Sequence, residues 1–548
     1  MNRWLSQGTY SGLSRRKAHY SRYGWFAALA CLASLEANAH AAQTDQPPAP
    51  NPAPAPTPAP AASPAPSPAT PAPTSPPPGG AAAPAPSAQP LTTVPPAPAA
   101  AATPAPPPAE EKAAEPFAFG DFTWLNGSNR QHKALLDSEV FTGSFLLDVN
   151  YTQSKANPID NTVVGSTALS RNNEITLAFM GFGGDFHYKN ARGRLMTQFG
   201  VRSVLVPRND FSTFRGQFDL QTSLRYISEA YGGYHWDVMN GINLDGGIFM
   251  SYVGLFSYDN FENWMYLPSF TSDNTPWFFN GLRLQIFPSD KLKIEPWLIN
   301  GWQTYGKFNE MPGFGFQILW RPGEWMSVLS NGYYGWDTQD SPGLWRFHSD
   351  NSWTFRYYNA PNETLDRIAV SITADIGGEL GDGLTVFGGS GTEGHCTTAH
   401  PCTSNFLSWM AYHRMSFWGD HFAWTFGGGM MHNPSRYLVL APTGQASPIP
   451  QPLSTQGVQY VTPTNAYDFN PGSKFDAYDY ETGIQYMPNE QVTYDLEVNH
   501  RQASVPYFAG HGGVTSPDGY ITTAIPTGWR ADLQKGDSRI IAALLVRF

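Results

Sequence analysis

The sequence predicts an all-β fold: a transmembrane, antiparallel, up-and-down β-barrel of about 16 strands, preceded by a disordered Pro/Ala-rich segment. Three observations lead to this prediction. Apolar and polar residues alternate with a period of two through residues 117–548, short and long connections follow one another between the predicted strands, and the last strand pattern ends on the terminal residue, Phe548. Two segments of different composition, residues 1–39 and 40–116, precede this part of the chain.

Residues 1–39 resemble a secretory signal peptide. Basic residues between Arg15 and Arg22 precede an apolar stretch from Trp25 to Leu35, and Ala37-Asn38-Ala39 has the A-x-A form of a cleavage site. The apolar stretch is shorter than the roughly 20 residues that a membrane-spanning helix needs. A cleaved signal is therefore favoured over the alternative, an uncleaved membrane anchor.

Residues 40–116 consist mainly of Pro, Ala, Ser and Thr, and they hold more than half of the chain's 49 prolines. Such a composition supplies no side chains for a hydrophobic core, and proline has no backbone N–H to donate. We expect a disordered linker with extended, polyproline-II-like stretches. It would lie in the periplasm as a spacer, or reach the cell wall.

Residues 117–548 carry the strand pattern. In the sequence VTYDLEVNH, which starts at Val492, apolar residues alternate with Thr493, Asp495, Glu497 and Asn499. A soluble β-sandwich would show the same alternation. Strands are predicted near residues 138–152, 172–182, 192–205, 220–235, 242–253, 277–287, 291–303, 314–321, 325–335, 343–358, 366–377, 405–418, 421–431, 475–487, 491–502 and 538–548.

The connections between these strands distinguish a membrane barrel from a sandwich. Those after even-numbered strands are mostly short turns, such as PSDK, RPGE and PNE. The long connections follow odd-numbered strands: residues 153–171, 254–276, 378–404, 432–474 and 503–537. Short turns at one rim and long loops at the other are typical of a transmembrane barrel. Since lipid offers backbone groups no hydrogen-bond partner, a sheet in a membrane must close on itself.

The C-terminal strand pattern, SRIIAALLVRF, places apolar residues at every second position, and Leu544, Val546 and Phe548 are the last of them. It resembles the C-terminal assembly signal of bacterial outer-membrane barrels. The resemblance implies that the barrel assembly machinery is a partner of the chain.

Three stretches resemble the OmpL-like putative β-barrel porin-2 family. They are FTWLNGSNRQ at the start of the domain, ISEAYGGYHWD followed by LDGGIFMSYVG, and WLINGWQTYGKFN, with the motifs Glu229-Ala230-Tyr231 and Asn300-Gly301-Trp302. The resemblance implies a pore for small hydrophilic solutes in a bacterial outer membrane. It assigns no catalytic residues to the chain. Residues 40–116 lie outside it.

Motifs of enzymes are incomplete in this sequence. GWQTYGKF, which starts at Gly301, departs from a phosphate-binding loop because Phe308 stands where Ser or Thr is needed. His348, Ser349 and Asn351 are the residue types of an outer-membrane phospholipase, but their order differs. We expect no catalytic residue, metal or cofactor. A barrel enzyme of lipase or protease type and a surface adhesin or receptor that uses the long loops remain alternative functions.

Charged residues on the inward face are the candidates for a pore lining. If Leu195 faces lipid, Arg194 and Arg202 face inward; on the strand near residue 495, Asp495 and Glu497 do so. Such groups can set ion selectivity, or they can pair along the wall as a structural ladder. Both roles remain open.

The connection GLFSYDNFENWMYLPSFTSDNT, residues 254–275, carries Asp259 and Glu262 among aromatic residues. Its position matches the loop that narrows the pore of sixteen-stranded porins, so we expect it to fold inward. The formal net charge of −11 argues against a nucleic-acid partner and favours a weak preference for cations. Outer-membrane lipid and small hydrophilic solutes are the expected partners, and a homo-oligomer is possible.

Cys396 and Cys402 are predicted to form a disulfide, because two nearby cysteines in a secreted loop are commonly oxidised. The neighbouring His395 and His400 do not complete a standard zinc spacing. Thiol labelling of the folded, non-reduced protein is expected to find no free cysteine. Two reactive thiols, or a stoichiometric bound metal, would contradict this prediction.

Overall fold

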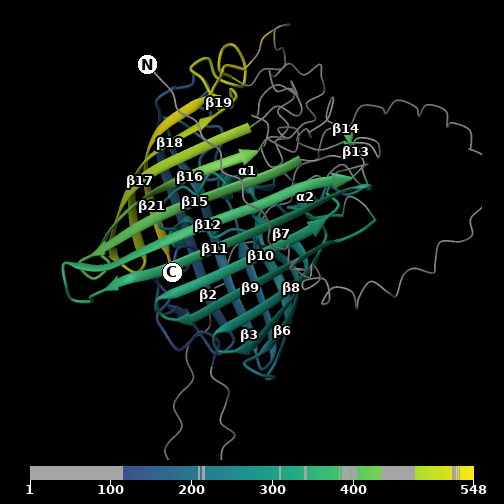
Figure 1. Cartoon of the computed structure of the whole chain (residues 1–548), viewed down its shortest axis with the longest axis vertical. Helices are drawn as coiled ribbons and strands as arrows, with labels where there is room; N and C mark the ends of the chain where they lie inside the picture. Colours follow the sequence, from purple (N-terminus) through teal and green to yellow (C-terminus); the bar gives the residue numbers. More distant parts are fainter. Residues whose placement is uncertain are drawn as a thin grey trace, which may run out of the picture. The chain divides into compact units, whose positions relative to one another are not determined.

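The computed structural model describes residues 115–548, except for residues 208–209, 211, 213–215, 308–309, 338–341, 382, 385–394, 397–403, 434–474, 521–525, 527–528 and 530. Sixteen long strands form one antiparallel sheet in which each pairs with its neighbours along the chain (Figure 1). They are β2 (Phe141–Ser154), β3 (Ile175–Tyr188), β4 (Ala191–Thr197), β5 (Ile227–Trp236), β6 (Ile242–Met250), β7 (Phe278–Ser289), β8 (Leu292–Ile299), β9 (Gly313–Gly323), β10 (Met326–Gly335), β11 (Leu344–Asn359), β12 (Leu365–Gly381), β15 (Ser404–Phe417), β16 (Phe422–Asn433), β17 (Phe475–Asn489), β18 (Val492–Ala503) and β21 (Gly536–Arg547).

Five shorter strands complete the described β-structure. The two-residue strand β1 (Leu136–Asp137) pairs with the start of β2. Two small hairpins lie in the long connections: β13 (Gly383–Leu384) pairs with β14 (His395–Cys396), and β19 (Phe508–Ala509) pairs with β20 (Leu533–Gln534). Within the described residues, no helix is long and apolar enough to span a membrane.

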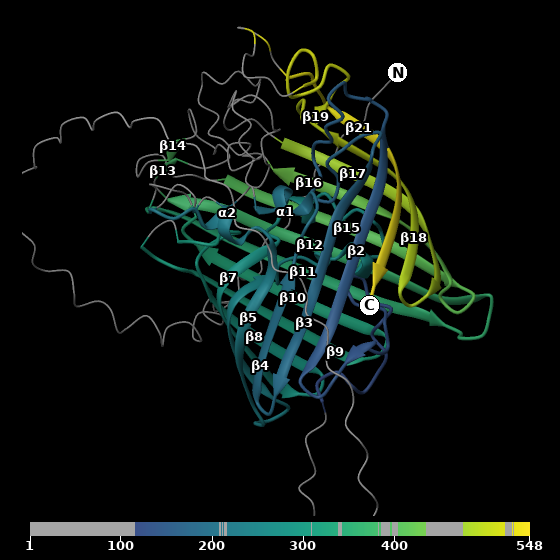
Figure 2. The ribbon, with the colours of Figure 1, turned by 180° about the vertical axis from the view of Figure 1, so that it is seen from behind.

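The sheet closes because the last long strand pairs with the first. β21 is antiparallel to both β18 and β2, with Leu146 opposite Arg547 and Ser154 opposite Arg539 (Figure 2). Phe145 and Phe548 exchange both backbone hydrogen bonds, at 2.8 and 2.9 Å. The predicted closed barrel of 16 strands is therefore confirmed.

The connections alternate as the sequence predicted. Short turns join β3–β4, β5–β6, β7–β8, β9–β10, β11–β12, β15–β16 and β17–β18, and we call this end of the barrel the short-turn rim. The other connections, which include the longest ones, all lie at the opposite long-loop rim. In transmembrane barrels the short turns face the periplasm.

One predicted strand, near residues 192–205, is wrong in its second half. β4 ends at Thr197, and Arg202–Leu205 forms the short helix α1 instead. The chain leaves the extended conformation at Gly200, whose φ of +89° is accessible to glycine. The strand predicted near residues 220–235 is wrong at its start, where a second short helix, α2 (Leu220–Leu224), lies. Residues 198–226 therefore form a long connection that the apolar periodicity concealed.

The two faces of the wall differ as expected for a barrel in lipid. On β18, Tyr494, Leu496 and Val498 are about half exposed, whereas Asp495 and Glu497 are buried on the inward face. β21 departs from this rule because its inward face also carries buried apolar residues, which pack on the inside of the barrel. Contact with lipid thus determines the residue types on the outward face, and the parts of the chain that fill the barrel determine those on the inward face.

We predict that Phe548→Asp lowers the yield of the assembled barrel, because Phe548 ends the strand that closes the sheet and its ring lies 6.3 Å from that of Phe145. The measurement is the amount of heat-modifiable protein in the outer membrane. Tyr520→Asp, at an aromatic residue that is exposed in a long connection, is the control and should assemble normally. Wild-type levels of assembled Phe548→Asp would contradict the prediction.

Candidate functional site

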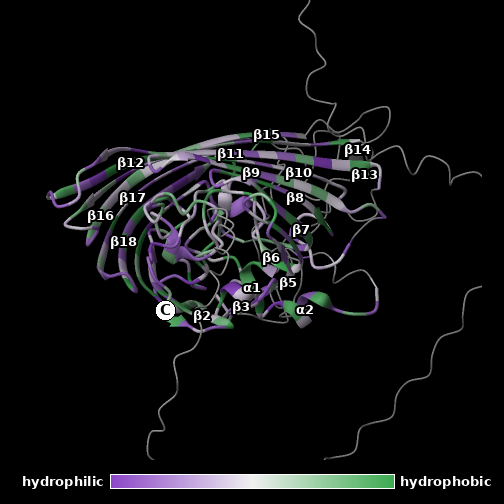
Figure 3. Cartoon of the chain, turned by 90° about the horizontal axis from the view of Figure 1, so that it is seen from below, coloured by the Kyte–Doolittle hydropathy of each residue, from purple (hydrophilic) through white to green (hydrophobic). Residues whose placement is uncertain are grey.

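The connection between β6 and β7, residues 251–277, folds into the barrel, and we call it the inner loop (Figure 3). It contains two turns of 3-10 helix, η3 (Asn260–Glu262) and η4 (Ser272–Asn274). Trp264, Tyr266 and Phe270 of this loop are almost completely buried. The expected inward fold is what the structure shows.

Carboxylates of the wall hold the backbone of the inner loop. Glu497 accepts the N–H groups of Tyr266 at 2.8 Å and of Leu267 at 3.2 Å. Asp479, on β17, accepts the N–H group of Phe270 at 2.9 Å. A hydrogen bond within a protein contributes roughly 0.5–1.5 kcal/mol, and a buried donor left without a partner costs more. These two acidic residues therefore fix the loop across the interior.

Arg501 of β18 holds the same part of the loop from its carbonyl side. Its guanidinium donates to the carbonyl of Pro268 at 2.7 Å and to the carboxylate of Asp273 at 2.5 Å. It also lies 4.8 Å from the ring centroid of Phe270. A fully buried arginine needs such partners, and the inner loop supplies them.

Asp259 and Glu262, predicted from the sequence, lie together beside the end of β21. Arg547 forms an ion pair with Glu262 and approaches Asp259 at 3.8 Å. Ser257 donates a further hydrogen bond to Glu262 at 2.6 Å. The structure thus places these two acidic residues in one charged cluster on the inner loop.

Arg194 belongs to a ladder of ion pairs along the wall. It contacts Glu229 of β5 at 2.5 Å and Asp185 of β3 at 2.6 Å. This is the arrangement of a structural ladder, one of the two roles that the sequence left open.

Arg202 does not lie on a wall strand, as the sequence suggested, because the strand ends before it. It lies on α1, is buried, and reaches the interior. Its guanidinium donates to the carbonyl of Tyr258 and lies 3.7 Å from the carboxylate of Asp148 on β2. Arg202 therefore connects residues 198–226 to the inner loop.

Asp495 reaches the inner loop through a neutral neighbour. Gln485 donates to Asp495 at 2.9 Å and accepts from Arg414 at 2.7 Å. Arg414 in turn donates to the carbonyl of Trp264 at 3.0 Å. Residues from β15, β17 and β18 thus converge on the inner loop near Trp264.

Residues 115–132, which precede the first strand, lie across the short-turn rim, and we call them the mouth segment. Hydrogen bonds join it to three turns: Phe117 N to Asp290 O at 2.7 Å, Trp124 Nε1 to Glu324 O at 3.1 Å, and Arg130 Nη1 to Asn489 O at 2.8 Å. Sequence reasoning used residues 122–131 for the family resemblance but assigned the segment no position in the barrel. The available signal was its aromatic residues, Phe117, Phe119, Phe122 and Trp124.

Charged groups of the mouth segment also meet the rim. The ring of His132 lies 2.8 Å from Glu490, and this hydrogen bond holds the pKa of Glu490 below its ordinary value. Burial lowers the pKa of Arg130 to about 10. Arg130 is still a cation at neutral pH. Its guanidinium lies 4.6 Å from the ring centroid of Phe261 in the inner loop.

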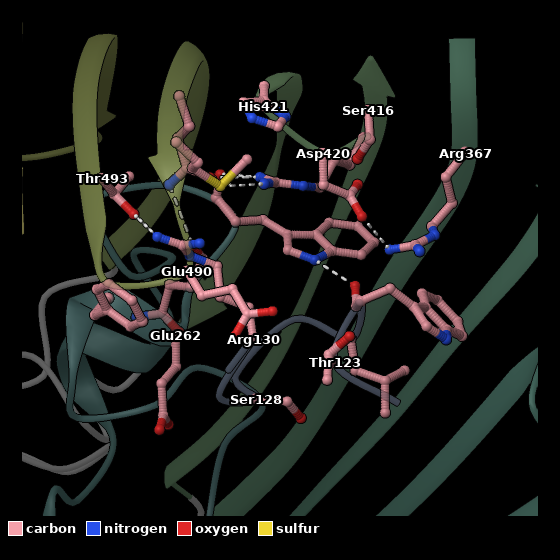
Figure 4. Close-up of a pocket in the computed structure, with 18 of the residues that line it drawn as sticks. Thr123, Ser128, Arg130, Glu262, Arg367, Ser416, Asp420, His421, Glu490 and Thr493 are labelled. Atoms are coloured by element: carbon pink, nitrogen blue, oxygen red, sulfur yellow. Dashed lines mark hydrogen bonds and ion pairs between the residues drawn. The ribbon is translucent and has the colours of Figure 1, made fainter. Parts of the chain in front are cut away.

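Two cavities adjoin the mouth segment. One, of about 270 Å³, is bordered by Arg130, Arg367 and Arg414 (Figure 4). The other, of about 240 Å³, reaches Arg321 and the wall of β9–β11. Leu125 and Ser128 line both cavities, so the segment lies between them.

Residues that suggested an enzyme do not converge. His348 is buried on the inward face of β11, whereas Ser349 and Asn351 occupy alternate positions, hydrogen-bonded to each other at 3.0 Å. Among the described residues, no three His, Cys, Asp or Glu side chains are grouped so that they could hold a metal. The predicted pair Cys396 and Cys402 lies outside the residues whose side chains are described, and its disulfide stays a prediction.

We predict that Glu497→Ala loosens the inner loop, because two hydrogen bonds to its backbone, of roughly 0.5–1.5 kcal/mol each, are lost. The measurement is the rate at which a thiol reagent labels Cys in the variant Ser269→Cys, at a loop residue that is fully buried. The rate should rise in the Glu497→Ala background. It should be unchanged by Glu363→Ala, at an exposed turn residue; equal labelling in both backgrounds would contradict the anchoring role.

Solved structures similar to this barrel are outer-membrane proteins. They include OmpT of Vibrio cholerae, folded in vitro (9% identity, TM-score 0.38, covering 76% of this chain and 100% of that one), the outer membrane channel DcaP of Acinetobacter baumannii (10%, 0.40, 75% and 96%), and an anion-selective porin from Comamonas acidovorans (8%, 0.40, 74% and 99%). No curated protein matches the chain.

The family comparison covers the first part of the barrel. Residues 141–399 match a family described as "Putative beta-barrel porin-2, OmpL-like". The match begins at the first residue of β2 and includes the two motifs at Glu229 and Asn300. Over these residues the chain is therefore similar to the OmpL-like, putative β-barrel porin-2 family of the outer membrane.

Proposed function

We propose that this porin-family barrel lets small hydrophilic solutes and ions diffuse passively across the outer membrane, with a weak preference for cations. The observation that carries the proposal is the closed barrel of sixteen long strands with charged side chains on its inward face. A barrel of this size encloses more space than wall side chains alone can fill, and 16–18 strands commonly leave an aqueous channel.

The inner loop sets the width of the passage in this proposal. It crosses the interior and is fixed to β17 and β18 by Glu497, Asp479 and Arg501. Flux through a pore depends on its narrowest width and on the charges that line it. The loop would therefore admit small solutes and exclude large ones.

The preference for cations follows from the acidic inward face of two neighbouring strands. β17 and β18 carry four inward carboxylates, those of Asp479, Glu481, Asp495 and Glu497. Negative walls concentrate cations. Arginines near the short-turn rim oppose them, and most of the carboxylates also hold the inner loop, so the expected preference is mild.

The position of the mouth segment supports a periplasmic linker. Residue 115 follows the Pro/Ala-rich residues and lies at the short-turn rim, the end that faces the periplasm in transmembrane barrels. Removal of residues 1–39 on export, insertion by the barrel assembly machinery, contact of the linker with the cell wall and a homo-oligomeric state belong to the same proposal.

Solute uptake by proteoliposomes tests the proposal. Vesicles that contain the folded protein are expected to swell in small sugars and to resist large oligosaccharides. Absence of swelling with every solute, from protein shown to be folded by heat modifiability, would contradict passive diffusion.

The ion preference has its own test, the variant Asp259→Asn with Glu262→Gln. It removes two negative charges beside Arg547 and should lower the cation-to-anion permeability ratio. The measurement is the reversal potential in a salt gradient, with a larger effect at low salt because charges are screened over about 10 Å at 0.1 M.

The matched control is Asp518→Asn with Glu363→Gln, which makes the same change in net charge at exposed residues of two connections. It should leave the reversal potential unchanged. An anion preference in the native protein would show that the arginines control the narrowest part of the pore.

A further inference from the structure

We propose that the mouth segment is a gate: the chain's own residues 115–132 narrow the pore at the short-turn rim, and their release widens it. The inference rests on the proposed function, since a gate needs a pore. It adds a part of the chain that precedes every strand and that the family match does not include.

The gate is seated by aromatic rings that stack on basic residues of the rim. Arg321 lies 4.5 Å from the ring centroid of Phe122 and 4.9 Å from that of Phe117. Arg356 lies 5.2 Å from the ring of Trp124. These two arginines stand near the ends of β9 and β11 beside the short turns. The rim thus presents cations to the segment, and the segment presents ring faces to the rim.

The gate is also attached to the inner loop. Trp264 donates its backbone N–H to the side chain of Asn126 at 2.9 Å and its indole N–H to the carbonyl of Trp124 at 3.0 Å. Gly127 donates to the carbonyl of Glu262 at 3.1 Å. The mouth segment and the inner loop are therefore in direct contact beside the two cavities.

Gly127 is required for this contact. Its φ is +75°, and a Cβ atom there would lie 2.1 Å from the carbonyl oxygen of Leu255. Only glycine lets the segment approach the inner loop so closely. A side chain at position 127 would therefore prevent the close contact between the mouth segment and the inner loop.

The mode of attachment allows release. From residue 115 to residue 132 the segment forms no strand or helix, and it is held by ring stacking, ion pairs and separate hydrogen bonds. It can leave the rim without opening the β-ladder that closes the barrel. On its N-terminal side it continues into the Pro/Ala-rich residues, through which a pull on the linker would act directly on the gate.

The first test weakens the seat with Phe122→Ala and Trp124→Ala together. Single-channel conductance in planar bilayers should rise by about twofold or more, because conductance follows the open cross-section of the pore. Gly127→Val should also raise it. Phe218→Ala, at an exposed aromatic residue of the connection between β4 and β5, is the matched control and should conduct like the native protein.

An engineered disulfide, which we call the lock, distinguishes two explanations of a higher conductance. One is release of the segment, and the other is the space that two smaller side chains leave. A Cβ atom on Gly120 would lie 2.2 Å from Cγ of Glu324, which brings the two Cβ positions within about 4 Å, as a disulfide needs. We expect Gly120→Cys with Glu324→Cys, added to the weakened variant and oxidised, to restore the low conductance. Reductant should raise it again. The weakened variant without the two new cysteines is treated with reductant as the control for cleavage of the predicted Cys396–Cys402 disulfide.

The outcomes distinguish the gate from the pore. A weakened variant that conducts like the native protein, or an oxidised lock that leaves the high conductance unchanged, would overturn the gate and leave the porin function intact. Absence of conductance in every folded variant, including the reduced lock, would overturn the porin function itself.

Discussion

The constraint on which this structure depends is that every backbone N–H and C=O group in a membrane must find a partner within the protein. The pairing of β21 with β2 satisfies it, because it removes the two free edges of a sheet of sixteen long strands. Closure at this strand number creates an interior too wide for wall side chains to fill. The inner loop and the mouth segment are among the parts of the described chain that occupy it.

Buried charges of the wall have a double use in this arrangement. Glu497, Asp479 and Arg501 would be costly without partners in a barrel interior. The backbone and the acidic side chain of the inner loop supply those partners, over sequence separations of more than 200 residues. In the proposed pore, the groups that set ion preference would therefore also position the constriction, and selectivity and pore width would be coupled.

The wall could be predicted from the sequence because lipid imposes one simple rule on it. Leu496 and its outward neighbours must be apolar, and the resulting alternation marks each strand. The interior obeys no such rule. Arg202 was assigned to a strand because the apolar pattern continues past Gly200, where the backbone turns. The role of Phe122 and Trp124 was missed because rings that stack on distant arginines leave no periodic signal. The inward fold of residues 251–277 was expected by position, but its partners on β17 and β18 depend on register.

The central claim is that sixteen strands enclose a water-filled passage that the inner loop and the mouth segment narrow from within. Single-channel recording of the native, folded protein in planar bilayers tests it most directly. The account predicts discrete, ohmic steps, well below the conductance of an unobstructed barrel of this strand number. Steps as large as those of an open barrel, or a folded protein that produces no steps at all, would contradict it.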